Sequence, residues 1–399
     1  MRSLLLFFVV VFVTISTMVC AHGAEQPDFF DYESNYYRVR SYISLKNAQE
    51  IGAILDTYME FFANFFRFSP HALEQPLRVR IFDNDRGFNE YLAEIIDEQR
   101  DDAVYLHSSS AQRSEIVGSM IHSDNIDQNF TQQVFVQFFR AFIQNPPLWL
   151  REGFAAYFEK LQFQNGELTF HENLTWLETF RTLFPSDLRM NPLNIPDFLS
   201  SDVKYARENI NTFYPQSWGI VHYLLNTDNR DHNRMIWEAL NSLDTEADLQ
   251  TNSWRAYKKT FQWINTEEFL SDMYAYLGSL RTYAELIETG IERYESGQLD
   301  EAANFLLQAI ERNDESYIPY YYFGLINYDR GNYELADENY TTAIQKGQND
   351  ALVYYALGLN AFASENYDQA NEHFDVSLQL DAGNFMEKIE AVRNQISDI

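Results

Sequence analysis

The pattern of hydrophobic and polar positions changes character along the chain. Residues 36–43 alternate polar and apolar side chains, as in a strand, and residues 47–66 carry apolar side chains at helical spacing. A second strand is expected over 77–82, a helix over 88–96 and a further strand over 103–107. We therefore predict a small α+β unit to about residue 120, followed by a mostly helical region.

The last third of the chain repeats with a period of 34 residues. The recurring small residues are Gly290, Gly324 and Gly358 and, twelve positions further along each unit, Ala302, Ala336 and Ala370. This period and these small residues resemble the tetratricopeptide repeat, in which two helices cross closely around a turn. The resemblance implies an all-α solenoid that binds other proteins.

The repeat period also gives the domain boundaries. We assign the three units to residues 283–316, 317–350 and 351–384, with a capping helix over 385–396, because stacked units need a polar-faced final helix. In tetratricopeptide arrays the fifth and twelfth positions of each unit point into a concave groove. Apart from Ile287, these positions are aromatic here: Tyr294, Tyr321, Tyr328, Tyr355 and Phe362.

Charge narrows the choice of partner for this groove. The chain carries a net charge of −30, and residues 283–399 hold 22 Asp and Glu against 6 Lys and Arg. Such a field repels nucleic acid and anionic membranes and favours basic or neutral partners, although solubility alone would also explain it. We predict a protein or peptide partner with aromatic, apolar or basic anchors. The alternative is that the aromatic rings pack between repeats or against the preceding domain.

The first 24 residues have the pattern of a secretory signal. Arg2 precedes an apolar stretch over 4–19, and small residues follow it. Cys20 is the single cysteine, and we favour simple cleavage over lipid modification there because bulky Val19 precedes it. We expect an exported protein, periplasmic or extracellular, without a transmembrane anchor after cleavage.

Residues 148–159, which read Leu-Trp-Leu-Arg-Glu-Gly-Phe-Ala-Ala-Tyr-Phe-Glu, carry the second resemblance. They resemble the W-L-x-E-G-x-A-x-Y-x-E helix of the peptidase MA-like gluzincin metallopeptidases. The resemblance covers residues 35–280, and we assign the domain to 25–282. It implies a zincin-like fold in which the preceding helix carries H-E-x-x-H and Glu152 is the third zinc ligand.

The zinc motif itself is degenerate. Val136 and Arg140 stand for the two histidines and Gln137 for the catalytic glutamate, so that Glu152 alone is retained. Valine offers no lone pair, glutamine cannot accept the proton, and arginine would repel a dication. We therefore predict a non-catalytic domain without metal or cofactor. We also hypothesise that Arg140 takes the place of zinc and pairs with Glu152, the alternative being that Arg140 points to solvent.

Two further functions remain open from the sequence. One is a zinc-dependent hydrolase whose site is rebuilt around Glu152 and His222, with His107 or His122, although His222 reads better as a core or cleft histidine. The other is an inactive cleft that holds a peptide or glycan without cutting it. His171-Glu172 begins a partial H-E-x-x-H, but a threonine occupies the position of the second histidine.

Overall fold

The computed structural model describes residues 29–96, 98–108, 113–164, 166–184, 194–313, 315–347 and 350–397. The predicted signal segment, with Cys20, lies outside these residues. Within the described ranges, none of the helices combines the length and apolar character that crossing a bilayer requires.

The N-terminal part is built on a mixed sheet with the strand order β1-β2-β3-β5-β4. Its strands are β1 (Phe30–Glu33), β2 (Tyr37–Ser41), β3 (Leu77–Phe82), β4 (Val104–Leu106) and β5 (Glu115–Ser119). The three central strands run parallel, whereas β1 and β4 are antiparallel edges. The predicted small α+β unit is confirmed, although β1 and β5 were not expected.

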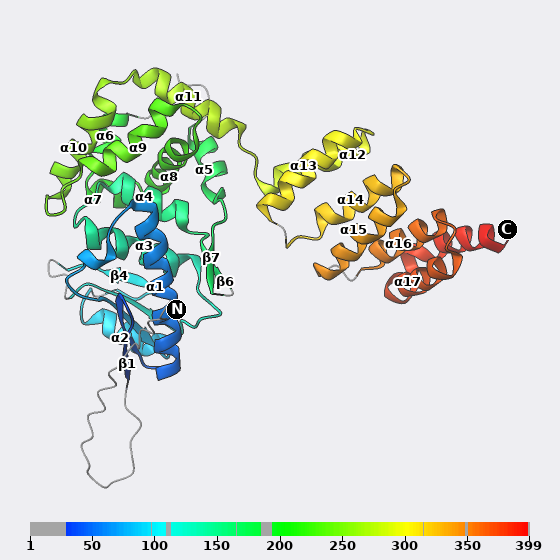
Figure 1. Ribbon diagram of the computed structural model, residues 1–399, viewed down its shortest axis with the longest axis horizontal. Coiled ribbons are helices and arrows are strands. Elements are labelled where there is room, and N and C mark those ends of the chain that lie inside the picture. The colour runs from blue at the N-terminus through cyan, green and yellow to red at the C-terminus, as the bar shows by residue number, and fades with distance from the viewer. Residues whose placement is uncertain are drawn as a thin grey trace, which may run out of the picture.

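Helices cover both faces of this sheet (Figure 1). Helices α1 (Leu45–Phe66) and α3 (Gln128–Phe142) pack on the face that carries Val39, Val79 and Ile116. Helix α2 (Asp85–Ala93) packs on the opposite face. Side chains cap all three helices at their first turn, from Ser44, Asn84 and Asp127.

The middle of the chain is mostly helical. Its elements are α4 (Leu148–Phe158), the hairpin β6 (Gln162–Gln164) and β7 (Glu167–Thr169), α5 (Thr175–Leu183), α6 (Ile195–Leu199), α7 (Val203–Glu208), α8 (Ile210–Asn226), α9 (Arg230–Ser242), α10 (Leu249–Thr260) and α11 (Thr266–Ser279). Helix α4 packs directly on α8, with Gly153 at the crossing. The core of this region is continuous with that between the sheet and α1 and α3.

The C-terminal part is a stack of helix pairs that leads away from the larger domain (Figure 1). Its helices are α12 (Tyr283–Glu295), α13 (Leu299–Arg312), α14 (Ile318–Asp329), α15 (Tyr333–Gln345), α16 (Ala351–Ala363) and α17 (Tyr367–Ser397), the last kinked at Asp381. The recurring glycines lie where paired helices touch: a Cβ on Gly324 would lie 2.3 Å from the Tyr340 ring, and one on Gly358 2.4 Å from Phe374. Close helix crossing therefore explains the glycine period.

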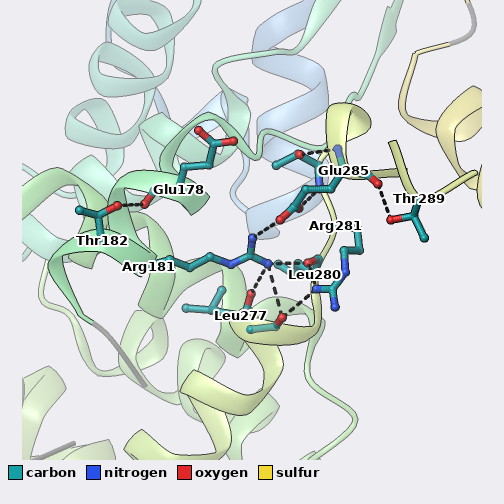
Figure 2. Close-up of polar contacts among 10 residues, drawn as sticks. Glu178, Arg181, Thr182, Leu277, Leu280, Arg281, Glu285 and Thr289 are labelled. Atoms are coloured by element: carbon teal, nitrogen blue, oxygen red, sulfur yellow. Dashed lines mark hydrogen bonds and ion pairs between the residues drawn. The ribbon is translucent and has the colours of Figure 1, made fainter. Parts of the chain in front are cut away.

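One arginine joins the first repeat to the helical region (Figure 2). Arg181 of α5 donates to Glu285 of α12 at 2.8 Å and to the carbonyl of Leu280 at 2.5 Å. It also reaches the carbonyls of Leu277 and Gly278, at 3.3 and 3.4 Å. These carbonyls belong to the end of α11, where helical acceptors have no partner within the helix. Arg181 thus serves as the C-terminal cap of α11 and fixes the start of the repeats.

We expect Arg181→Met to lower the free energy of unfolding by about 1.5–3 kcal/mol, the usual cost of losing a hydrogen bond to a charged group. Urea unfolding of the full chain measures this. Arg234→Met is the matched control, because Arg234 is exposed and its ion pairs among the described residues, with Asp231 and Glu238, stay within its own helix. Equal effects of the two substitutions would show that Arg181 does not tie the two parts together.

Candidate functional site

Val136 and Gln137, which the predicted resemblance aligns with the first histidine and the glutamate of a zinc motif, have structural roles. Val136 is half-buried and packs against the main core. Gln137 is 1% exposed, and its amide donates to the carbonyl of Arg78 in β3 at 2.8 Å. Gln137 is therefore turned toward the sheet, and it anchors α3 to the central strands.

The hypothesised pair between Arg140 and Glu152 is wrong. Glu152 accepts instead from its neighbour Arg151, whose Nε lies 2.7 Å and whose Nη2 lies 2.5 Å from Glu152 Oε1. Arg140 makes one long contact, from Nη2 to the Asn145 side chain at 3.5 Å. Its Nε is buried and has no hydrogen-bond partner in the part of the chain that the structure describes. Arg151 precedes Glu152 in α4 and is the cation that bonds to its carboxylate, a contact that the motif alone did not reveal.

Two side chains at the β4 edge, Tyr105 and His107, are close enough to Arg140 and Arg151 for these charges to act on their pKa values. The hydroxyl of Tyr105 lies 3.5 Å from Nδ1 of His107, and the amide of Tyr105 donates to Gln133 of α3 at 3.0 Å. Burial and then the charges of Arg140 and Arg151 together lower the pKa of His107 to about 4. Burial and then Arg151 lower the pKa of Arg140 to about 10. The arrangement is a half-buried group of cations beside a neutral imidazole.

The residues of the rebuilt-hydrolase alternative have separate partners. Glu152 pairs with Arg151, His107 with Tyr105, and His222 with Glu172. Within the described parts of the chain, no group of three or more His, Cys, Asp and Glu side chains is arranged to hold a metal ion.

His222 lies at the centre of a second polar network. It is 0% exposed, with Nε2 2.8 Å from Glu172 and Nδ1 3.3 Å from the hydroxyl of Tyr276. Glu172 also forms an ion pair with Arg312 of α13, so this network, like Arg181, connects the repeats to the helical region. A nearby carboxylate favours imidazolium, but Arg312 already neutralises Glu172, and burial lowers the pKa of His222 to about 3. This burial agrees with the prediction that His222 is a core or cleft histidine.

A surface hollow of about 520 Å³ lies at the opposite end of α3 from Arg140. Asp127, Asn129, Glu159 and Gln162 contribute to its lining. Glu159 accepts from Gln132 at 2.8 Å, and burial raises its pKa. The Nδ2 of Asn129 donates to Asp102 at 3.1 Å, whereas its Oδ1 is buried without a hydrogen-bond partner among the described residues.

The five aromatic residues assigned to the repeat groove are all half-buried. Tyr321 contacts Tyr340 and Tyr355 contacts Phe374, so part of each ring packs within its own repeat. Tyr294 bridges two repeats through a hydrogen bond to Asp329 at 2.9 Å. The rings therefore combine packing with partial exposure, and their role in binding a partner stays a prediction.

The cations of the repeats are all engaged. Each of the six has a partner within the chain: Arg293 with Glu301, Arg312 with Glu172, Arg330 with Asp300, Lys346 with Glu315, Arg393 with Asp375, and Lys388 over the ring of Phe385. One carboxylate, that of Asp350, acts on a tyrosine assigned to the groove. Burial, followed by Tyr322 and Asp350, raises the pKa of Tyr321 to about 12.

Residues 130–243 match the family described as "Protein of unknown function (DUF1570)". This segment runs from α3 to the end of α9 and contains Arg140, Arg151 and Glu152. No curated protein matches the chain.

Solved tetratricopeptide structures are among those similar to this chain. The first TPR of Spaghetti (RPAP3) bound to the HSP90 peptide SRMEEVD is 15% identical, with 29% of this chain and 94% of that chain covered and a TM-score of 0.27. YrrB, "a TPR protein with an unusual peptide-binding site", is 14% identical, with 49% and 97% covered and a TM-score of 0.27. The Yersinia enterocolitica type III secretion translocator chaperone SycD is 14% identical, with 33% and 96% covered and a TM-score of 0.27. The tetratricopeptide character of this chain therefore rests on its own helix pairs and glycine contacts.

Proposed function

We propose that the protein is an exported, non-catalytic adaptor that binds a basic peptide segment along α12, α14 and α16. The observation that carries this proposal is the row of half-buried aromatic rings beside carboxylates, in a module whose cations are all engaged within the chain. A partner must bring its own positive charge to neutralise this surface.

The aromatic rings supply the second part of the recognition. Burial and then Tyr333, Asp329 and Tyr355 raise the pKa of Tyr328, so the ring of Tyr328 in the second repeat lies near that of Tyr355 in the third. Tyrosine gives a large contact area at low entropic cost, and its ring face attracts Lys and Arg. A segment with alternating basic and apolar anchors satisfies both features.

The non-catalytic and exported parts of the proposal have separate support. Val136, Gln137 and Arg140 lack the chemistry of the zinc motif, and Gln137 is committed to β3. Export rests on the sequence of residues 1–24. The zincin-like ancestry of the larger domain belongs to this proposal and rests on the stretch around Trp149 and Glu152.

Selection from a displayed peptide library against the full chain tests the proposal. We expect enriched peptides that carry Lys or Arg together with aromatic residues, with an affinity that falls as salt rises. Tyr321→Leu with Tyr328→Leu is expected to weaken binding about tenfold or more, since aromatic contacts dominate such surfaces.

Leu335→Ala is the matched control, because Leu335 is exposed on the second helix of its repeat and outside the aromatic row. It should leave the affinity unchanged. Enrichment of acidic peptides, or equal effects of the groove and control variants, would contradict the proposal.

A further inference from the structure

The two arginines beside the degenerate motif carry positive charge that the protein does not balance. Arg140 of α3 and Arg151 of α4 both feel the charge of one carboxylate, that of Glu152, but only Arg151 bonds to it, with two nitrogens. Arg140 keeps one contact, 3.5 Å long, although a guanidinium offers five N–H donors. The half-buried cluster therefore has a net charge of about +1.

This positive charge is unusual for the chain that contains it. Among 59 Asp and Glu residues, Glu152 is the one carboxylate in the described residues that acts on the pKa of Arg140. The Nε of Arg140 is buried without a hydrogen-bond partner, which is costly for a charged donor. An anion bound at the guanidinium of Arg140 would supply the acceptor that this group lacks among the described residues.

The groups around Arg140 fit one class of anion. A guanidinium presents parallel N–H donors that match the two oxygens of a carboxylate. The charge of Arg140 acts on the pKa values of Tyr105 and His107, two side chains at the β4 edge that are neutral at pH 7 and whose hydroxyl and Nδ1 lie 3.5 Å apart. A net charge of +1 matches a monoanion better than a phosphate dianion.

We propose that Arg140, with Arg151 and Tyr105, binds the carboxylate of a ligand in the place where the resemblance puts a metal ion. Arg140 contacts the carboxylate oxygens, Arg151 adds its charge while it remains bonded to Glu152, and Tyr105 donates its hydroxyl. This site is separate from the repeat groove and does not depend on the function proposed for that groove.

Titration of the full chain with sodium acetate at pH 7 tests the site. The probe is the imidazole ¹H–¹³C NMR signal of His107, assigned with His107→Gln, and sodium chloride at equal ionic strength is the reference. We expect a saturable shift of this signal with acetate alone. Arg140→Met should weaken acetate binding about tenfold or more, since the bidentate contact is lost.

Arg140→Lys gives a second variant that keeps the charge and loses the planar fork, and it should also bind acetate more weakly. Arg86→Met, at an exposed arginine that pairs with Glu90 on α2, is the control and should bind as the wild type does. A shift that chloride reproduces, or acetate binding that survives Arg140→Met, overturns the proposal. Tighter binding of inorganic phosphate than of acetate would overturn the assignment to a monoanion.

Discussion

Gly153→Ala is expected to lower the free energy of unfolding by about 3 kcal/mol or more, the upper end of the usual cost of overpacking. Helices α4 and α8 cross at this residue. A Cβ on Gly153 would lie 2.4 Å from the carbonyl oxygen of Ser217 and 2.5 Å from Val221 Cγ2. Because a backbone oxygen cannot rotate away, the two helices would have to separate, and the core that they share would open.

Gly278→Ala is the matched control for this substitution. Gly278 is exposed near the end of α11, and a Cβ there would meet nothing within 4 Å. Alanine is favoured over glycine in a helix by about 0.5–1 kcal/mol, so this variant should gain stability. Urea unfolding of both variants checks the pair. A Gly153→Ala protein as stable as the wild type would show that α4 and α8 do not cross this closely.

Repetition explains why the C-terminal helices could be predicted from the sequence. The glycine at each crossing recurs every 34 residues because the two helices of each unit cross closely there, as the contacts of Gly324 and Gly358 illustrate. The turns between the paired helices recur with the same period. Gly297 and Gly331 adopt positive φ angles of 76° and 75°, and Glu365 takes the equivalent position in the third unit with φ 63°.

The local sequence pattern did not predict two of the strands, β1 and β5. Strand β5 is short and buried on both faces, so its residues do not alternate between polar and apolar. Strand β1 is a short edge strand that pairs with β2 in a hairpin, where the ion pairs Arg40–Asp31 and Arg38–Glu33 join the two strands. With four residues it offers too short a pattern for a prediction.

The sequence located the candidate site but predicted the wrong partner for Glu152. The resemblance placed α3 and α4 together, and the structure has Arg140 and Glu152 in one cluster. Which cation bonds to Glu152 depends on side-chain reach, and consecutive helical residues do not usually face each other. Arg151 had no role in the motif, although its position next to Glu152 was a usable signal. The bonds of Glu172 to His222 and Arg312 join segments that lie 50 or more positions apart and had no sequence signal.

The buried imidazole of His222 is expected to make stability strongly dependent on pH. Its pKa lies at about 3 in the folded chain, against an ordinary value of 6.5, because burial penalises the charged form. Above pH 6.5 the imidazole is neutral in both the folded and the unfolded chain, so its titration does not change the free energy of unfolding. Below pH 6.5 the unfolded chain binds a proton that the folded chain does not bind, so stability falls as pH falls and levels off near pH 3.

The expected slope is about 1.4 kcal/mol for each pH unit below 6.5, or roughly 5 kcal/mol over the whole interval. His222→Gln removes the titration while its amide can still donate to Glu172, so the stability difference between wild type and variant should change with this slope. His71→Gln, at an exposed histidine, should show the same pH dependence of stability as the wild type. Urea unfolding at pH 7, 6, 5 and 4 measures all three proteins. A difference that stays flat would mean that Glu172 holds His222 protonated in the folded chain, in which case Glu172 would pair with two cations.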